Sequence, residues 1–159
     1  MSYTITDILD KFIKINDIRI NVYEEYEEIL KIRETKDNLK YMIIVKSLIK
    51  EVYRENEYYD TIKKTRIPSE MDEVNFLSYD KISFSMESFK KNINKYKVND
   101  CKQIISSFID IEQDILALMI TVQGMLVLQT EDTETLAYNV LTEVIKEREN
   151  SITKLSKLN

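Results

Sequence analysis

The sequence predicts an all-α protein, on the evidence of its composition, its apolar spacing and its short polar connections. The 159 residues include one glycine and one proline. The residues that favour the tight turns of a β-sheet are therefore almost absent. Apolar residues instead recur every three or four positions over four long stretches, which is the period of a helix face. A chain of this length fits one compact domain. We therefore expect a single helical-bundle domain over residues 1–159.

The first two predicted helices form a hairpin. One runs from Thr4 or Thr6, either of which can cap it, to about Glu34, and its apolar stripe is wide enough to face two neighbours. The second runs from about Asn38 to Arg66 and ends before the proline that follows. The connection between them is short, polar and rich in capping residues, which is typical of antiparallel neighbours.

A long crossover is expected from Pro68 to Asn99, where the helical pattern loosens. We expect one or two short helices within it, one around Met71 to Leu77 and another, capped by Ser83 or Ser85, over Met86 to Tyr96. Two antiparallel helix pairs joined by a long link are a recurring bundle topology. The sequence thus predicts an antiparallel four-helix bundle.

The second pair begins with the most apolar stretch of the chain, Cys101 to Gln129. A polar turn follows, and the fourth helix is expected from about Thr133 to Leu155. In the third helix, Glu112 takes one place of the apolar seam. A carboxylate at that position could be met by a metal, a cation, a proton or a water-filled gap.

Charged residues also enter the seams of the other helices. Arg19 takes one place in the first helix and Glu55 one place in the second. In the fourth helix Glu147 and Arg148 fall in the same sector as the apolar residues. We therefore expect acids from separate helices to converge in the interior, where positive groups must meet them.

The order of a helical pair, a crossover and a second pair resembles the ferritin-like superfamily, and rubrerythrin-type domains in particular. That family places Glu-x-x-His on the second and fourth helices and single glutamates on the first and third. Here Glu55-Asn56-Glu57-Tyr58 matches the second-helix motif, Glu147-Arg148-Glu149-Asn150 the fourth-helix motif, and Glu112 the third-helix acid. The first helix has no matching acid, and Arg19 lies in its seam instead. The resemblance implies a ferritin-like antiparallel four-helix bundle.

Both ligand histidines of that family are replaced, since Tyr58 and Asn150 stand in their places and the chain contains no histidine. Three states of the acids remain open. Glu55, Glu112 and Glu147 could pair with Arg19 and Arg148, could bind a divalent metal such as Mg²⁺, Mn²⁺ or Ca²⁺ through oxygen alone, or could be exposed.

The leading functional interpretation is a non-catalytic ferritin-like bundle that acts as a structural or protein-interaction module without a cofactor. The alternative is a metal-binding ferritin-like oxidoreductase or metal-storage protein with a carboxylate-only site. A further alternative is a helical chaperone or adaptor that binds a partner helix in a groove. The wide stripe of the first helix favours a homodimer through the outer face of the first hairpin.

Several other functions are disfavoured by composition. The net charge of −5 and the interleaving of acids with lysines argue against nucleic-acid binding. Without histidine, a Ser/His/Asp set cannot be formed. The uncharged stretch from Ile115 to Thr130 is shorter than the ~20 residues of a membrane span, and the N-terminus lacks the pattern of a secretory signal. We therefore expect a cytoplasmic protein with no membrane partner.

Overall fold

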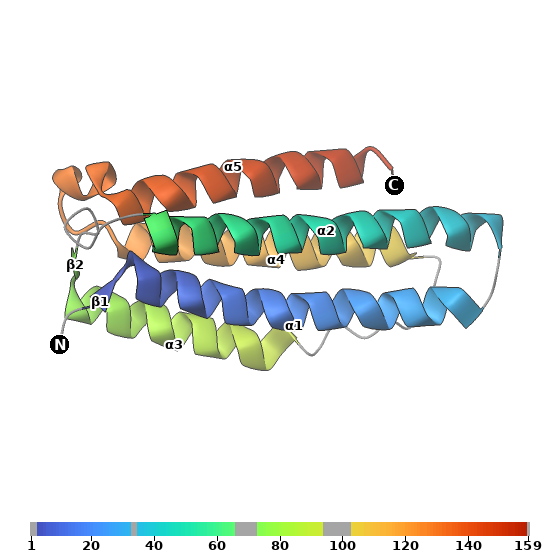
Figure 1. The fold of residues 1–159 in the computed structure, drawn as a ribbon, viewed down its shortest axis with the longest axis horizontal. Helices are drawn as coiled ribbons and strands as arrows, with labels where there is room; N and C mark the ends of the chain where they lie inside the picture. The colour runs from blue at the N-terminus through green and yellow to red at the C-terminus, as the bar shows by residue number, and fades with distance from the viewer. Residues whose placement is uncertain (1–2, 33–34, 66–72, 94–102, 159) are drawn as a thin grey trace.

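The computed structural model describes residues 3–32, 35–65, 73–93 and 103–158 of the chain, and its architecture is all-α (Figure 1). The all-α prediction is therefore confirmed. The five α-helices of the described residues are α1 (Ile5–Ile32), α2 (Lys36–Thr65), α3 (Phe76–Ile93), α4 (Ile104–Met125) and α5 (Leu136–Ser156). No described helix is both long and apolar enough to cross a membrane.

The helices are arranged as two hairpins with α3 between them in the sequence. α1 packs closely on α2, α4 packs closely on α5, and α3 lies against both α1 and α4. The four longest helices run along the long axis of the molecule, and the colours of Figure 1 show that α2 and α5 run in opposite directions. Each hairpin thus offers an inner face to the other.

The described part of the crossover contains one helix, where one or two short helices were predicted, and the bounds of this helix differ from those of both predicted segments. α3 extends from Phe76 to Ile93 and therefore overlaps both predicted segments. The side-chain Oδ1 of Asn75 accepts hydrogen bonds from the backbone N–H groups of Leu77 and Ser78, at 2.9 and 3.4 Å, which begins the helix. The serines that the sequence suggested as caps lie inside the helix. Residues 68–72 and 94–99 of the predicted crossover, which include Pro68 and Met71, are outside the described residues.

The boundaries of the second pair also move. α4 ends at Met125, four residues before the predicted end. The segment Thr130–Glu134 forms a 3₁₀ helix, η3, before α5 starts. Thr135, rather than Thr133, caps α5, since its Oγ1 accepts a hydrogen bond from the N–H of Tyr138 at 3.2 Å. Polar residues that looked like one turn therefore build a separate helical turn. The predicted starting residue Cys101 is outside the described residues.

Two short strands, which the sequence did not predict, tie the beginning of the chain to the crossover. β1 (Tyr3–Thr4) pairs antiparallel with β2 (Glu73–Val74), with Tyr3 opposite Val74 and Thr4 opposite Glu73. The ring of Tyr3 stacks on Tyr79 of α3 with centroids 3.7 Å apart. These contacts hold α3 beside the first turn of α1.

The buried apolar side chains form one cluster to which every α-helix contributes. Within this cluster, Phe108 of α4 packs edge-on against Tyr23 and Tyr26 of α1, with ring centroids 5.6 and 5.0 Å apart. Such pairs contribute about 0.5–1.5 kcal/mol beyond their burial. They fix the height of α1 against α4, and this height decides which polar residues meet in the interior.

Candidate functional site

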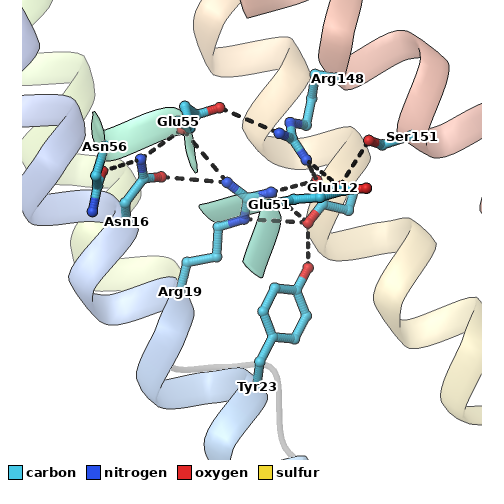
Figure 2. Close-up of polar contacts among 9 residues, drawn as sticks. All are labelled: Asn16, Arg19, Tyr23, Glu51, Glu55, Asn56, Glu112, Arg148 and Ser151. Atoms are coloured by element: carbon cyan, nitrogen blue, oxygen red, sulfur yellow. Dashed lines mark hydrogen bonds and ion pairs between the residues drawn. The ribbon is translucent and has the colours of Figure 1, made fainter. Parts of the chain in front are cut away.

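Four buried charged residues, one from each of the four longest helices, meet in the interior (Figure 2). Arg19 comes from α1, Glu55 from α2, Glu112 from α4 and Arg148 from α5. Their exposed fractions are 0%, 4%, 0% and 2%. We call this group, with the polar side chains that contact it, the Arg–Glu network.

Glu112 is the centre of the network. Nη2 of Arg19 donates to both of its carboxylate oxygens, at 2.6 and 2.7 Å, and Nε of Arg19 donates to Oε1 at 3.2 Å. From α5, the partner of α4 in the second hairpin, Nη1 of Arg148 donates to Oε2 at 2.7 Å. The hydroxyl of Tyr23 donates to Oε1 as well. A single carboxylate therefore holds α1 and α5 to α4.

Glu55 forms the second acidic position. Its Oε2 accepts a hydrogen bond from Nδ2 of Asn16 at 2.6 Å and lies 3.6 Å from Nη1 of Arg19. Its Oε1 accepts from Nη2 of Arg148 at 3.3 Å. Asn16 also donates to Oδ1 of Asn56 at 2.7 Å, and its own Oδ1 accepts from Nη1 of Arg19 at 3.3 Å. Both arginines thus bridge the two glutamates.

Helical spacing explains why three side chains of the Arg–Glu network come from α1. Asn16, Arg19 and Tyr23 are separated by three and four residues, so they share one face of the helix. All three are buried. A polar segment of α1 therefore faces the interior between apolar turns, level with Glu112 and Glu55 on the facing helices.

The charges of the network balance, since two guanidinium groups face two carboxylates. Burial alone would raise the pKa of Glu112, but Arg19 and Arg148 lower it from 4.5 to about 2. Burial would likewise lower the pKa of Arg19, but the attraction of Glu112 and Glu55 outweighs it, and the pKa is raised. Burial and the neighbouring Glu112 raise the pKa of Tyr23 well above its ordinary value, so its hydroxyl stays a donor. The network therefore favours the charged forms of Glu112, Arg19 and Arg148 at neutral pH.

On its outer side the network meets an open cleft of about 400 Å³ between α2 and α5. Glu51 stands at this edge: its Oε2 accepts a hydrogen bond from the hydroxyl of Ser151 at 2.8 Å and lies 3.5 Å from Nη1 of Arg148. Figure 2 shows Glu51 and Ser151 on the side of the network toward α5. Arg148 therefore connects the buried charges to the cleft.

The structure separates Glu147 from the other predicted site residues. Glu55 and Glu112 lie within one network with Arg19 and Arg148, whereas Glu147 is exposed and lines the cleft. Neighbouring residues on a helix point about 100° apart, and here the inward position is taken by Arg148. The expected meeting of Glu147 with the other two acids is not observed.

The donor set does not suit a resident metal ion. A cation between Glu55 and Glu112 would stand beside two guanidinium groups that already bind the same carboxylate oxygens. Within the described ranges, no group of three or more His, Cys, Asp or Glu residues is arranged to hold a metal. The chemistry of these residues is ion pairing.

Sequence reasoning missed several members of the network. Asn16 was not singled out as a donor to Glu55, and the hydrogen bond from Tyr23 to Glu112 was not predicted. The spacing of Asn16, Arg19 and Tyr23 on one helix face was the available signal. Glu51 and Ser151 lie 100 positions apart in the chain, and nothing in the sequence pairs them.

No protein-family model, no curated protein and no solved structure matches this chain. The family therefore stays a proposal, for which the helix order and the positions of the acids are the support.

Replacing Glu112 by Gln should strongly destabilise the protein. The substitution leaves two buried guanidinium groups facing one carboxylate, and breaking a buried ion pair from one side costs about 3–5 kcal/mol. Glu147→Gln is the matched control, because the same change at an exposed position of α5 should stay within about 0.5 kcal/mol of the wild type. Urea unfolding measures both. Equal, small effects would contradict the buried network.

The stability of the protein should fall in acid as Glu112 is protonated. Its pKa is lower in the folded state, at about 2, than its ordinary value of 4.5, so its contribution is complete above about pH 4.5 and is lost as the pH falls toward 2. Lowering the pKa by this amount corresponds to on the order of 3 kcal/mol. Carboxyl ¹³C chemical shifts of the wild type should show a glutamate that titrates near pH 2, far below the ordinary value of 4.5. Titration of all glutamates near pH 4.5 would contradict this.

Proposed function

We propose that this chain is a non-catalytic ferritin-like four-helix bundle that serves as a structural and protein-interaction module. The observation that carries the proposal is the Arg–Glu network. It lies at mid-height between two helical hairpins, where a ferritin-like bundle would place its metal ligands. Guanidinium groups supply the positive charge there, so the acids are neutralised without a cofactor.

The two arginines support a bundle without a metal, because they occupy the carboxylate oxygens that a metal ion would need. In a metal-binding bundle the carboxylates need free oxygen atoms to face the ions. Here Arg19 and Arg148 donate to both oxygens of Glu112, and Arg148 also donates to Glu55. The arginines hold the four helices together, a structural role for residues that could otherwise form a reaction centre.

The interaction surface that we assign lies at the tip of the first hairpin. An apolar groove of about 450 Å³ is lined there by Leu39, Ile43 and Ile44 of α2 and by Leu158. Ile43 is 71% exposed, and Ile32, at the end of α1, is also exposed. Exposed apolar side chains gathered around a groove favour a protein contact over simple solvation.

We assign a second copy of this chain as the occupant of the groove. Lys36, Asp37 and Lys40 stand on its border, so its edge carries both signs of charge. In a two-fold dimer the same patch meets itself, and Asp37 of each copy can approach a lysine of the other. The groove is therefore self-complementary in charge as well as apolar at its centre.

Adding metal to the growth medium should not produce a stoichiometrically metal-bound protein. The protein grown with added iron and manganese should contain less than stoichiometric metal after dialysis, and a chelator should leave the melting temperature unchanged, because both arginines already neutralise the acids. Elemental analysis and thermal unfolding measure these. A stoichiometric metal ion whose removal lowers the melting temperature would support the metal-binding alternative instead.

Charging the groove should weaken self-association. In the high micromolar range the wild type should sediment as a dimer, and Ile43→Lys should weaken the dimer at least about tenfold, because an apolar contact is replaced by a desolvated charge. Sedimentation equilibrium measures this.

Phe84→Lys is the matched control, since Phe84 is 76% exposed on α3, away from the groove. It should leave the dimer intact. A wild type that stays monomeric, or a dimer that Phe84→Lys breaks and Ile43→Lys does not, would contradict the assigned surface.

A further inference from the structure

The cleft between α2 and α5 is large enough for a small molecule, and it is separate from the proposed interaction surface. Its volume of about 400 Å³ is within the range of about 300–1,000 Å³ that such sites occupy. It lies away from the apolar groove, and the two share no lining residue. Its lining consists of Glu51, Arg54, Tyr58, Glu143, Val144, Glu147, Arg148, Asn150, Ser151 and Lys154.

Arg148, one of the residues that line the cleft, has an unused hydrogen-bond donor. Arg148 is 2% exposed, and two of its nitrogens bind Glu112 and Glu55. Its Nε is buried and has no hydrogen-bond partner. A buried donor without an acceptor is costly, so an acceptor group that reached Nε would gain a hydrogen bond.

The rim of the cleft carries charges of both signs that do not pair with one another. Arg54 on α2 and Lys154 on α5 stand near Glu143 and Glu147, and within the described ranges no ion pair joins these residues. All four are exposed. The charges are therefore available to a ligand without breaking an existing pair.

The balance of these charges selects the ligand. Inside, Arg148 and Arg19 are offset by Glu112 and Glu55, which leaves Glu51, Glu143 and Glu147 against Arg54 and Lys154. An anion such as phosphate would meet three carboxylates, and a diamine would meet two cations. A molecule with one anionic and one cationic group can place the anionic group near Arg54 or Lys154 and the cationic group near the glutamates.

We propose that this cleft binds a small zwitterion of the free amino-acid class. The carboxylate of the ligand accepts a hydrogen bond from Nε of Arg148 and faces Arg54. The ammonium group of the ligand faces Glu51 and Glu147. This inference is independent of self-association: the dimer experiment leaves it untouched, and the binding experiment leaves the apolar groove untouched.

The test is titration of the full chain with four probes of similar size: glutamine, glycine betaine, inorganic phosphate and putrescine. Backbone amide chemical shifts report binding and its location. Glutamine should shift α2 and α5 residues along the cleft with a dissociation constant in the millimolar range or tighter. Glycine betaine should bind more weakly, because its methylated nitrogen cannot donate hydrogen bonds to the glutamates. Phosphate and putrescine should shift neither helix.

Arg54→Gln should weaken glutamine binding about tenfold, the usual effect of losing one well-placed charged contact. Lys46→Gln is the matched control, since it removes one exposed positive charge from α2 outside the cleft. It should leave the affinity unchanged. The proposal is overturned if none of the probes binds, if phosphate or putrescine binds at least as well as glutamine, or if Arg54→Gln binds like the wild type.

Discussion

The carboxylate of Glu112 is the point on which the rest of the structure depends. It is fully buried, and a buried carboxylate is tolerated only when opposite charge and hydrogen-bond donors surround it. Arg19 from one hairpin and Arg148 from the other satisfy it together, and Glu55 then compensates the second positive charge. Sliding any of the four helices by one turn would separate these groups by about 5 Å. The apolar seams alone would tolerate such a slip, so the charges select one alignment.

The network contributes more to the specificity of the helix alignment than to the stability of the fold. Replacing a buried ion-pair network by well-packed apolar residues is often neutral or stabilising, because desolvating the charges costs about as much as their attraction returns. The network therefore favours one packing of the helices over its competitors. It also has a chemical consequence, since carboxylates bound to guanidinium groups are not open to a cation. The same residues that define the alignment thus keep the oxygens of both glutamates occupied by guanidinium groups.

The helices and most of the network could be predicted from the sequence, because both depend on local periodicity. Arg19, Glu55 and Glu112 each replaced an apolar residue in a seam, and the structure buries all three. The fourth helix was harder, since Glu147 and Arg148 are adjacent and only packing decides which one points inward. The two serines of the crossover were ambiguous because a serine can cap a helix or lie within it. The pairing of Glu51 with Ser151, and the cleft beside it, depend on tertiary distance alone and leave no pattern in one sequence.

The central claim, that Glu112 and Arg148 act as one coupled unit across α4 and α5, is tested most directly by a double-mutant cycle. The variants are Glu112→Gln, Arg148→Met and the pair of changes together, and the measurement is the free energy of unfolding in urea at neutral pH. Coupled residues should make the double variant at least about 2 kcal/mol more stable than the sum of the single effects predicts. Additivity within about 0.5 kcal/mol would contradict the account, because it would mean that the two side chains do not depend on each other.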